Sequence, residues 1–299
     1  MGNIRRTDTH SAHEAPPFRL ARPTARIAPL VVCSPHSGRH YPEAFLAASR
    51  LSLAALRRAE DAFVDELFGD APALGAPLLA ALYPRSYLDV NREPYELDPA
   101  MFSGAVPAFV NGASPRVRSG FGTVPCQVAG AGAIYDARLP FAEAEWRLAT
   151  LYRPYHTALT DLIAQARARF DPVIVLDAHS MPSSGGVLGD QRAANLADVV
   201  LSDRFGQSCG EAIVAHAERY LRGAGYSIRR NDPYAGGFTT EYYGRPAEGV
   251  HTLQIELNRA LYWDEARHAR HDGFDRLRAD MRGLMAALAA VVRPALAAE

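Results

Sequence analysis

The stretch that most constrains this chain is 172–182, which reads PVIVLDAHSMP. Residues 173–176 are an aliphatic, mostly β-branched run, which is typical of a buried strand. Three polar residues, Asp177, His179 and Ser180, follow at once. Open α/β sheets carry their chemistry at the carboxyl ends of their strands. The stretch therefore predicts a strand that delivers ionisable groups to a functional edge, although a strand followed by a capped turn would give the same local pattern.

Strand-like apolar runs alternate with helix-like patterns along most of the chain. Strands are expected at 29–33, 77–82, 86–90, 173–176, 196–201, 226–230 and 250–257. Helices are expected at 52–67, 141–170, 211–223 and 264–292, the second of them bent or broken near Pro154. The alternation predicts an α/β fold with a mixed, largely parallel β-sheet flanked by helices.

Composition limits the classes of protein that this chain can belong to. The 299 residues are 48% hydrophobic and carry a net charge of -1, which suits a large core and gives no electrostatic footprint for nucleic acid. The longest apolar run, 284–292, is too short to span a membrane. We expect residues 1–24 to be a flexible tail and residues 25–299 to form a single domain. Three scattered cysteines favour a reducing compartment, so we expect a cytoplasmic protein. We expect this protein to be a monomer or homodimer.

Histidines that follow expected strands indicate a metal site. His36 comes after the strand 29–33, and His179 comes after 173–176. A catalytic zinc site takes three protein ligands and keeps one position open for water. Asp61 is the preferred third ligand, because its helix follows the His36 loop. Glu60 and Asp65 are the alternatives.

Glu256 is an unusual residue for an apolar strand. It lies between Ile255 and Leu257, where a carboxylate is costly unless it has a partner or a task. Beside a metal it would act as a general base and then as the proton donor to a leaving amine. The alternative is a glutamate on the solvent face of an edge strand.

Arg85, Asn91 and Arg92 flank the expected strand 86–90. A guanidinium group pairs with a carboxylate through two parallel hydrogen bonds, so these residues predict a substrate that carries a carboxylate. One of them could also hold the oxyanion formed from the cleaved carbonyl. Salt bridges to acidic residues of the following loop are the alternative.

Residues 206–210 form a competing motif, because GQSCG matches the G-x-S-x-G of serine hydrolases. Asp232 and His251 follow Ser208 in the order that such an enzyme uses. The nucleophile of that motif sits directly at a strand end, however, and here Asp203-Arg204-Phe205 separate the motif from Ser202, where the strand is expected to end. We therefore expect Ser208 to cap a helix.

Six motifs occur in order between about residue 30 and residue 265. They read PHSGRHYP, EDAFVDELF, RSYLDVNRE, LDAHSMP, RNDPYAGGFTT and LQIELNRALY. Together they resemble the N-formylglutamate amidohydrolase family, whose fold is similar to that of the zinc carboxypeptidases and aspartoacylase. The resemblance implies a mixed eight-stranded sheet between helices and one zinc per chain, held by His36, Asp61 and His179. The compact His-x-x-Glu spacing of carboxypeptidases is absent, since residue 39 is arginine.

The resemblance also implies roles around the metal. Glu256 takes the place of the general base, and Asn91-Arg92 looks like the pair that receives the substrate carboxylate. With Glu256 we expect Arg92 to be catalytic and Arg85 to contact substrate. In the motif RNDPYAGGFTT, Tyr234 looks like a mobile tyrosine that covers bound substrate, and we assign Asn231 and Gly237 to substrate binding as well.

The implied reaction is hydrolysis of an N-formyl amino acid to formate and the free amino acid. The reference substrate is N-formyl-L-glutamate, at the last step of one route of histidine degradation. N-formylaspartate or another small N-acyl amino acid is an alternative substrate, and a carboxylate-binding protein without catalysis is the alternative of another class. The loop 99–138 is expected to shape the pocket.

Overall fold

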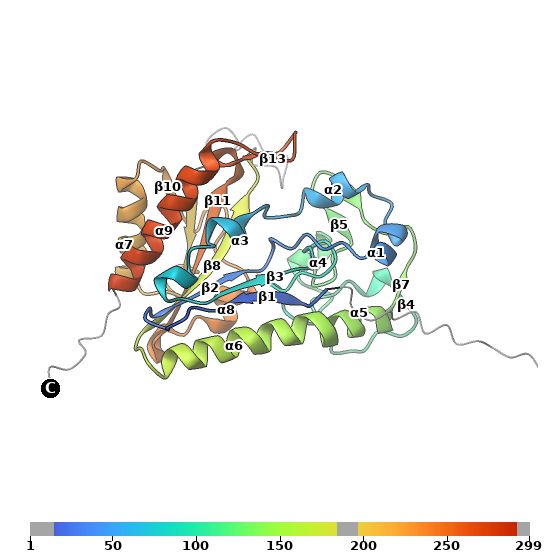
Figure 1. Cartoon of the computed structure of the whole chain (residues 1–299). Coiled ribbons are helices and arrows are strands. Elements are labelled where there is room, and N and C mark those ends of the chain that lie inside the picture. Colours follow the sequence, from blue (N-terminus) through green and yellow to red (C-terminus); the bar gives the residue numbers. More distant parts are fainter. Residues whose placement is uncertain (1–14, 184–196, 292–299) are drawn as a thin grey trace, which may run out of the picture.

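A seven-stranded sheet forms the centre of the computed structural model, which describes residues 15–183 and 197–291 (Figure 1). Across the sheet the strands are β1 (Phe18–Ala21), β3 (Leu78–Ala81), β2 (Leu30–Ser34), β8 (Val173–Met181), β11 (Val250–Asn258), β9 (Val199–Ser202) and β10 (Ile228–Arg230). Strands β3, β2, β8 and β11 run parallel, as do β9 and β10, whereas β1 on β3 and β9 on β11 are antiparallel. The expected mixed, largely parallel sheet is confirmed, with seven strands in the described residues rather than eight.

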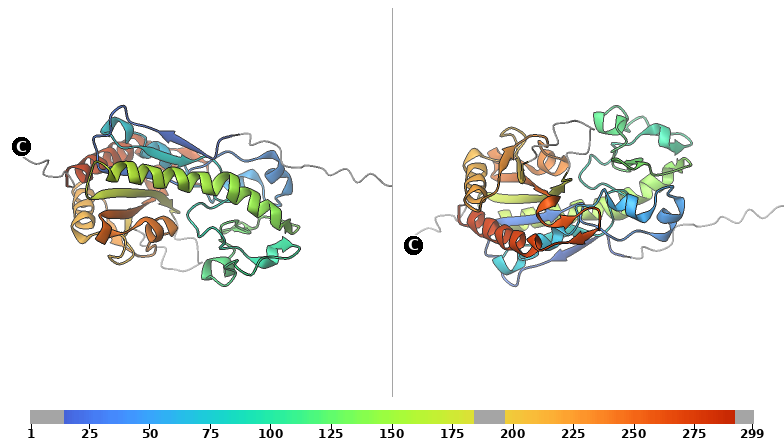
Figure 2. Two further views of the ribbon diagram at one scale, coloured as in Figure 1. Left: turned by 90° about the horizontal axis from the view of Figure 1, so that it is seen from below. Right: turned by 90° about the horizontal axis from the view of Figure 1, so that it is seen from above.

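Helices cover both faces of the sheet (Figures 1 and 2). On one face lie α5 (Phe141–Arg147), a π-helical turn (Leu148–Tyr152) and α6 (Arg153–Arg167). On the other lie α3 (Val64–Leu67), α7 (Glu211–Gly223) and α9 (Gly273–Val291). Alternate residues of each strand face opposite layers, so Leu30 and Val32 pack towards α9 while Val31 and Cys33 pack towards α6. No described helix is both long and apolar enough to cross a bilayer.

The remaining elements are short. They are α1 (Glu43–Ala48), α2 (Leu53–Arg57), α4 (Pro115–Arg118), α8 (Phe238–Tyr243), the two-residue strands β4 (Phe102–Ser103), β5 (Gln127–Val128), β6 (Gly132–Ala133), β7 (Leu139–Pro140), β12 (Trp263–Asp264) and β13 (Ala269–Arg270), and 3-10 turns at Pro72–Leu74, Pro99–Met101, Pro246–Glu248 and Arg259–Leu261. Several of them lie within 94–138, a segment rich in glycine, proline and serine that includes the loop 99–138.

The helix expected at 52–67 is broken, which corrects the sequence prediction. Helix α2 ends at Arg57, α3 begins at Val64, and Phe63 between them has a left-handed backbone with φ 58°. The N–H of Asp61 donates to the carbonyl of His36 at 3.0 Å instead of to a helical carbonyl. Asp61 and Asp65 therefore do not share a helix face, and Asp61 reaches a different set of partners.

The strand expected at 86–90 is also wrong. Residues 84–88 form a turn in which the N–H groups of Tyr87 and Leu88 donate to the carbonyl of Pro84. Side chains of the α5–α6 layer take the free carbonyls: Arg147 donates to Tyr87 O and His156 to Val90 O. These long-range side-chain contacts replace a neighbouring strand, and the apolar pattern of the segment gives no sign of them.

The helical region expected at 141–170 is helical from Phe141 to Arg167. The π turn before Pro154 accommodates this residue, so the chain continues as α6 without a break. The expected tail 1–24 is wrong for residues 18–21, because β1 pairs with β3 at the sheet edge and Phe18 packs edge-on against Tyr155. The expected strand 196–201 begins at residue 196, which lies outside the described residues.

Candidate active site

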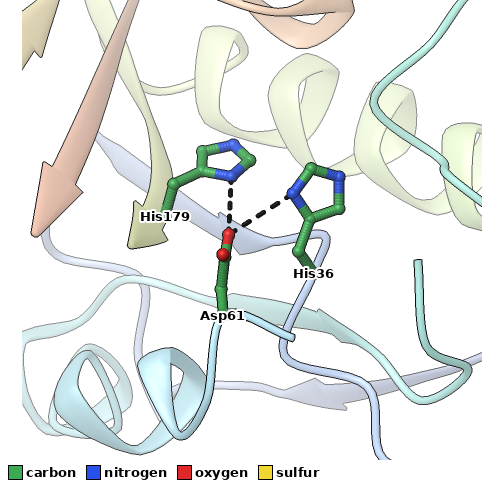
Figure 3. Close-up of side chains that lie close together, drawn as sticks. All are labelled: His36, Asp61 and His179. Atoms are coloured by element: carbon green, nitrogen blue, oxygen red, sulfur yellow. Dashed lines mark hydrogen bonds and ion pairs between the residues drawn. The ribbon is translucent and has the colours of Figure 1, made fainter. Parts of the chain in front are cut away.

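Three side chains from separate segments meet at one buried point. His36 lies just after β2, His179 lies on β8, and Asp61 lies between α2 and α3. Asp61 Oδ2 lies 3.0 Å from His179 Nδ1 and 3.4 Å from His36 Nδ1, with the carboxylate placed between the rings (Figure 3). One ligand atom from each residue falls within 4.8 Å of the others. Strands β2 and β8 are parallel neighbours, which is why both imidazoles reach the same edge of the sheet.

The far nitrogen of each imidazole is held by a second residue. His36 Nε2 lies 2.7 Å from Asp89 Oδ1. His179 Nε2 lies 3.0 Å from Asp177 Oδ1 and 3.0 Å from Asn91 Nδ2. Metal-ligating histidines are commonly held in this way by a carboxylate, which fixes the tautomer and turns the other nitrogen towards the ion.

The donor set fits a zinc ion. Two imidazole nitrogens and one carboxylate oxygen form a catalytic zinc set. Tetrahedral bonds of about 2.0–2.1 Å put neighbouring ligand atoms roughly 3.3 Å apart, close to both contacts of Asp61 Oδ2. His36 Nδ1 is buried without a hydrogen bond among the described residues. The site therefore has the residue types, the spacing and the unused lone pair that a metal requires.

The two alternative carboxylates have other partners. Glu60 accepts from Tyr41 Oη at 2.9 Å and from Arg57. Asp65 pairs with Arg19 at 2.7 Å and with Arg39. Of the three acidic candidates, Asp61 is the one that lies between the imidazoles.

The second oxygen of Asp61 is bound on the side away from the histidines. Asp61 Oδ1 accepts from Arg259 Nη2 at 3.2 Å and from Ser180 Oγ at 3.3 Å. Burial alone would raise the pKa of Asp61, but its contacts with His179 and His36 hold that pKa well below the usual range. The carboxylate is thus kept ionised, with Oδ2 directed at the rings.

Glu256 lies beside this trio. It is opposite His179 in the parallel pairing of β11 with β8, and Leu253, Ile255 and Leu257 face the other layer. Strand β11 lies between β8 and β9, so the alternative of a solvent-facing edge strand is wrong. Gln254 Nε2 donates to Glu256 Oε1 at 2.8 Å, and burial raises the pKa of Glu256 to about 7. A carboxyl group with such a pKa can both accept and donate a proton near neutrality.

A cavity of about 250 Å³ opens over the two imidazoles of the trio. Its lining includes His36, His179, Arg85, Asn91, Arg92, Arg116, Tyr234, Gly237 and Glu256. A second cavity of about 190 Å³ shares Arg85, Arg92, Tyr234 and Glu256 with the first, and it reaches Asp61 and Arg259. Both cavities therefore border Glu256 and at least one residue of the trio.

The two arginines of the sequence analysis are held in fixed positions. Arg85 Nη2 pairs with Asp89 Oδ2 at 2.8 Å. Arg92 donates from Nε to Phe121 O at 3.0 Å and from Nη1 to Asn91 O at 2.8 Å. Asp89 thus binds His36 and Arg85 with different oxygens, which ties the metal site to the cationic wall of the cavity.

Asn91 lines the cavity, but protein groups occupy its amide. Nδ2 donates to Asp177 and contacts His179, while Oδ1 accepts from the backbone and hydroxyl of Thr239. We therefore expect Asn91 to hold Asp177, which in turn orients His179. Gly237 lies against Asn91 so closely that an added Cβ would come within 2.5 Å of Asn91 Nδ2.

The structure does not bring Asn231 into either cavity. Its Nδ2 donates to Asp203 Oδ1 at 2.6 Å and its Oδ1 accepts from the Asp203 N–H. Asn231 therefore stabilises the turn that precedes Tyr234, and Tyr234 itself lines both cavities.

The serine motif forms no catalytic arrangement. Ser208 is buried and its hydroxyl donates to Thr252 O at 2.9 Å. His251 Nδ1 accepts from the N–H of Gly210. The expectation that Ser208 caps a helix is also wrong, because α7 begins after Gly210 without a side-chain cap.

Three functional neighbours were not predicted. Asp89 falls within the expected strand 86–90, and Arg259 and Gln254 follow no local pattern. Asp89 had one usable signal, a carboxylate among apolar residues, the same signal that identified Glu256. Arg259 is buried and pairs with Asp61 across nearly two hundred residues of sequence, so nothing local in the sequence indicates it.

The fold and the site define a hydrolase of the α/β class with a histidine–carboxylate centre. The sequence pattern of the N-formylglutamate amidohydrolase family matches residues 28–263. The N-formylglutamate deformylase of Pseudomonas aeruginosa strain PAO1 is 32% identical over 241 residues, covering 79% of this chain and 83% of its own. That of Pseudomonas putida is 29% identical over 245 residues, covering 79% and 82%.

A solved structure is similar over nearly the whole chain. The N-formylglutamate amidohydrolase of Ralstonia eutropha JMP134 shares 41% identity, with a TM-score of 0.88 over 93% of this chain and 99% of its own. The chain belongs to the N-formylglutamate amidohydrolase family and is a hydrolase that acts on an amide bond.

Proposed function

We propose that this protein is a zinc-dependent hydrolase that converts N-formyl-L-glutamate and water to formate and L-glutamate. The buried His36–Asp61–His179 trio beside Glu256 carries the proposal, and the names of the similar proteins support the substrate. The reaction would place the enzyme at the last step of a cytoplasmic route of histidine degradation. We propose that residues 25–299 act as one domain, as a monomer or homodimer.

The trio would hold one zinc ion per chain. The ion would lower the pKa of a water molecule and polarise the formyl carbonyl. Asp89 and Asp177 accept from the imidazole Nε2–H groups and so keep the Nδ1 atoms directed at the ion, and Arg259 keeps Asp61 Oδ2 free for it. The chain thus supplies a fixed three-ligand set with room beside it for substrate.

Glu256 would move the protons. As a carboxylate it accepts one proton from the attacking water, and as an acid it donates that proton to the leaving nitrogen when the C–N bond breaks. Its pKa near 7 suits both steps, and the Gln254 amide fixes the orientation of the carboxyl group. The products are formate and the free amine of glutamate.

The arginines would bind the negative charges. Arg85 lies next to the trio through Asp89 and is suited to the oxyanion that develops on the formyl oxygen. Arg92, held by two backbone carbonyls, presents a fixed guanidinium to the substrate's α-carboxylate. Tyr234 lies over the same cavity and would cover bound substrate.

A panel of three substrates tests this proposal. Formate release is measured from N-formyl-L-glutamate and N-formyl-L-aspartate, and acetate release from N-acetyl-L-glutamate. We expect the highest kcat/KM with N-formyl-L-glutamate. A higher value with N-formyl-L-aspartate would assign the alternative substrate, and no turnover of any of the three by metal-loaded protein would refute the proposed reaction.

A further inference from the structure

The larger catalytic cavity is lined by several cationic side chains and by one acidic side chain, Glu256. Its wall holds three guanidinium groups, those of Arg85, Arg92 and Arg116. Arg85 and Arg92 share one carboxylate, Asp89, whose Oδ2 lies 2.8 Å from the first and 3.6 Å from the second. Such a wall favours an anionic occupant.

Arg116 has the weakest partner of the three. Its Nη1 lies 3.8 Å from Glu96 Oε2, and its side chain is 37% exposed. The other oxygen of Glu96 accepts from Ser114 Oγ. Arg116 therefore keeps hydrogen-bond donors that are available to a ligand in the cavity.

The backbone around Arg116 is fixed although it lies within the irregular segment 94–138. It belongs to α4, whose first turn is capped by Ser114 Oγ accepting from Val117 N at 3.0 Å. The N–H of Thr123 donates to Glu96 O at 2.8 Å, which attaches the following loop to the turn after Arg92. The guanidinium is thus presented from an anchored helical turn.

We propose that Arg116 binds the side-chain carboxylate of the substrate and selects dicarboxylic N-formyl amino acids. The assignment rests on the proposed function, in which Arg92 takes the α-carboxylate and the formyl group lies at the trio. N-formylglutamate carries two carboxylates, and Arg116 supplies the second guanidinium beside Arg92.

The proximity of the arginines supports an anion between them. Burial lowers the pKa of Arg92 to about 10. The negative charge of Asp89 opposes this shift, whereas the positive charges of Arg85 and Arg116 add to it. A bound carboxylate would relieve this repulsion between like charges.

The smaller cavity is a poorer receptor for a second carboxylate. Of its additional arginines, Arg259 is already paired with Asp61 and Glu265. Arg58 donates to Gly130 O at 3.0 Å. The remaining wall includes apolar residues such as Phe121 and Val128.

The test compares two substrates of similar size that differ at the end of the side chain, which is a carboxylate in N-formyl-L-glutamate and an uncharged amide in N-formyl-L-glutamine. In Arg116→Met we expect kcat/KM for the glutamate substrate to fall about 10- to 100-fold, mainly through KM, as for loss of a charged hydrogen bond. The value for the glutamine substrate should stay within about twofold of the wild type. Arg116→Lys should recover part of the preference.

Arg118→Met is the matched control, because Arg118 lies on the same turn, is exposed and donates to Ala113 O. We expect it to behave as the wild type. Equal losses on both substrates in Arg116→Met, or an unchanged preference, would overturn the assignment.

Binding separates this inference from the proposed function. Calorimetric titration with N-formyl-L-glutamate compares zinc-loaded Glu256→Gln with zinc-loaded Glu256→Gln/Arg116→Met, in which the ligand is hydrolysed slowly, and should show the same affinity loss. If Glu256→Gln binds this ligand through Arg116 and the wild type releases no formate, the proposed reaction fails and the role of Arg116 in binding stands. Equal affinity of the two proteins refutes the receptor whatever the activity.

Discussion

Asp61 uses its two carboxylate oxygens for different purposes. Oδ2 lies between the imidazoles of His36 and His179, whereas Oδ1 is bound by Arg259 and Ser180. This division leaves a single oxygen for a metal ion. In the proposed enzyme Arg259 is therefore a positioning residue, since it would act on the metal through Asp61.

Loss of Arg259 should weaken zinc binding. In Arg259→Met the Oδ1 atom loses its cationic partner, and we expect zinc affinity to fall about 10- to 100-fold, as for other residues that hold a metal ligand. Competition with a chromophoric chelator measures the affinity. Arg259→Lys should restore part of it, and the exposed Arg276→Met should not change it; unchanged affinity in Arg259→Met would contradict the role.

Glu256→Gln should separate metal binding from catalysis. The amide keeps the shape of the side chain but cannot take a proton, so kcat should fall roughly 10²- to 10⁴-fold. Zinc content should stay that of the wild type, because Glu256 is outside the ligand trio. Metal analysis and steady-state kinetics are the two measurements, with the exposed Glu248→Gln as control. Full activity of Glu256→Gln would refute the general base.

At the scale of elements, side chains connect α6 to the turn that precedes the site. His156 Nε2 lies 2.8 Å from Val90 O, and its Nδ1 lies 2.8 Å from the Tyr243 hydroxyl on α8. One N–H and one lone pair satisfy both contacts, so the neutral ring fits. Burial lowers the pKa of His156 to about 4.

This lowered pKa predicts a pH dependence of stability. Between an unfolded-state pKa of about 6.5 and the folded-state value, the unfolded chain binds a proton that the folded chain does not. As pH falls through this window, His156 should lower the free energy of unfolding by at most about 1.4 kcal/mol per pH unit. Urea unfolding of wild type and His156→Gln at pH 7, 5.5 and 4.5 measures it. Parallel pH profiles would contradict the assignment.

The sequence predicted elements well where a local pattern decides them. The runs at 29–33, 77–82, 173–176 and 250–257 all became strands of the central sheet. The errors occurred where distant side chains overrode the pattern. Arg147 and His156 hold 86–90 out of a sheet, and Asp61 leaves its expected helix to reach two imidazoles.

The candidate site also combines residues that a local sequence pattern indicates with residues that no local pattern indicates. His36 and His179 could be expected to meet, because each follows a strand and the two strands are parallel neighbours. Glu256 was identified by a charge in an apolar strand. Asp89 and Arg259 reach the site only through contacts made after folding, so the one-dimensional pattern could not assign them.

At the scale of the whole molecule, the proposed metal site joins separate parts of the chain. The segment after β2, the break between α2 and α3, and β8 each supply one candidate ligand. A metal bound there links these segments only in the folded chain, so metal binding adds to the stability of the fold.

Removal of metal should therefore lower thermal stability. Zinc at 100 times its dissociation constant adds about 2.7 kcal/mol, which corresponds to a rise in Tm of roughly 4–5 °C for a chain of this size. Calorimetry of chelated and zinc-restored protein measures the difference. His179→Ala should abolish the shift, and a shift retained in that variant would place the stabilising metal elsewhere.

The most direct test of the central claim is a zinc titration of metal-free protein that follows formate release from N-formyl-L-glutamate. The account predicts negligible turnover without metal and a linear rise in rate that ends at one zinc per chain. Full turnover by the metal-free protein, or a rate that stays at zero after the trio has bound zinc, would contradict it.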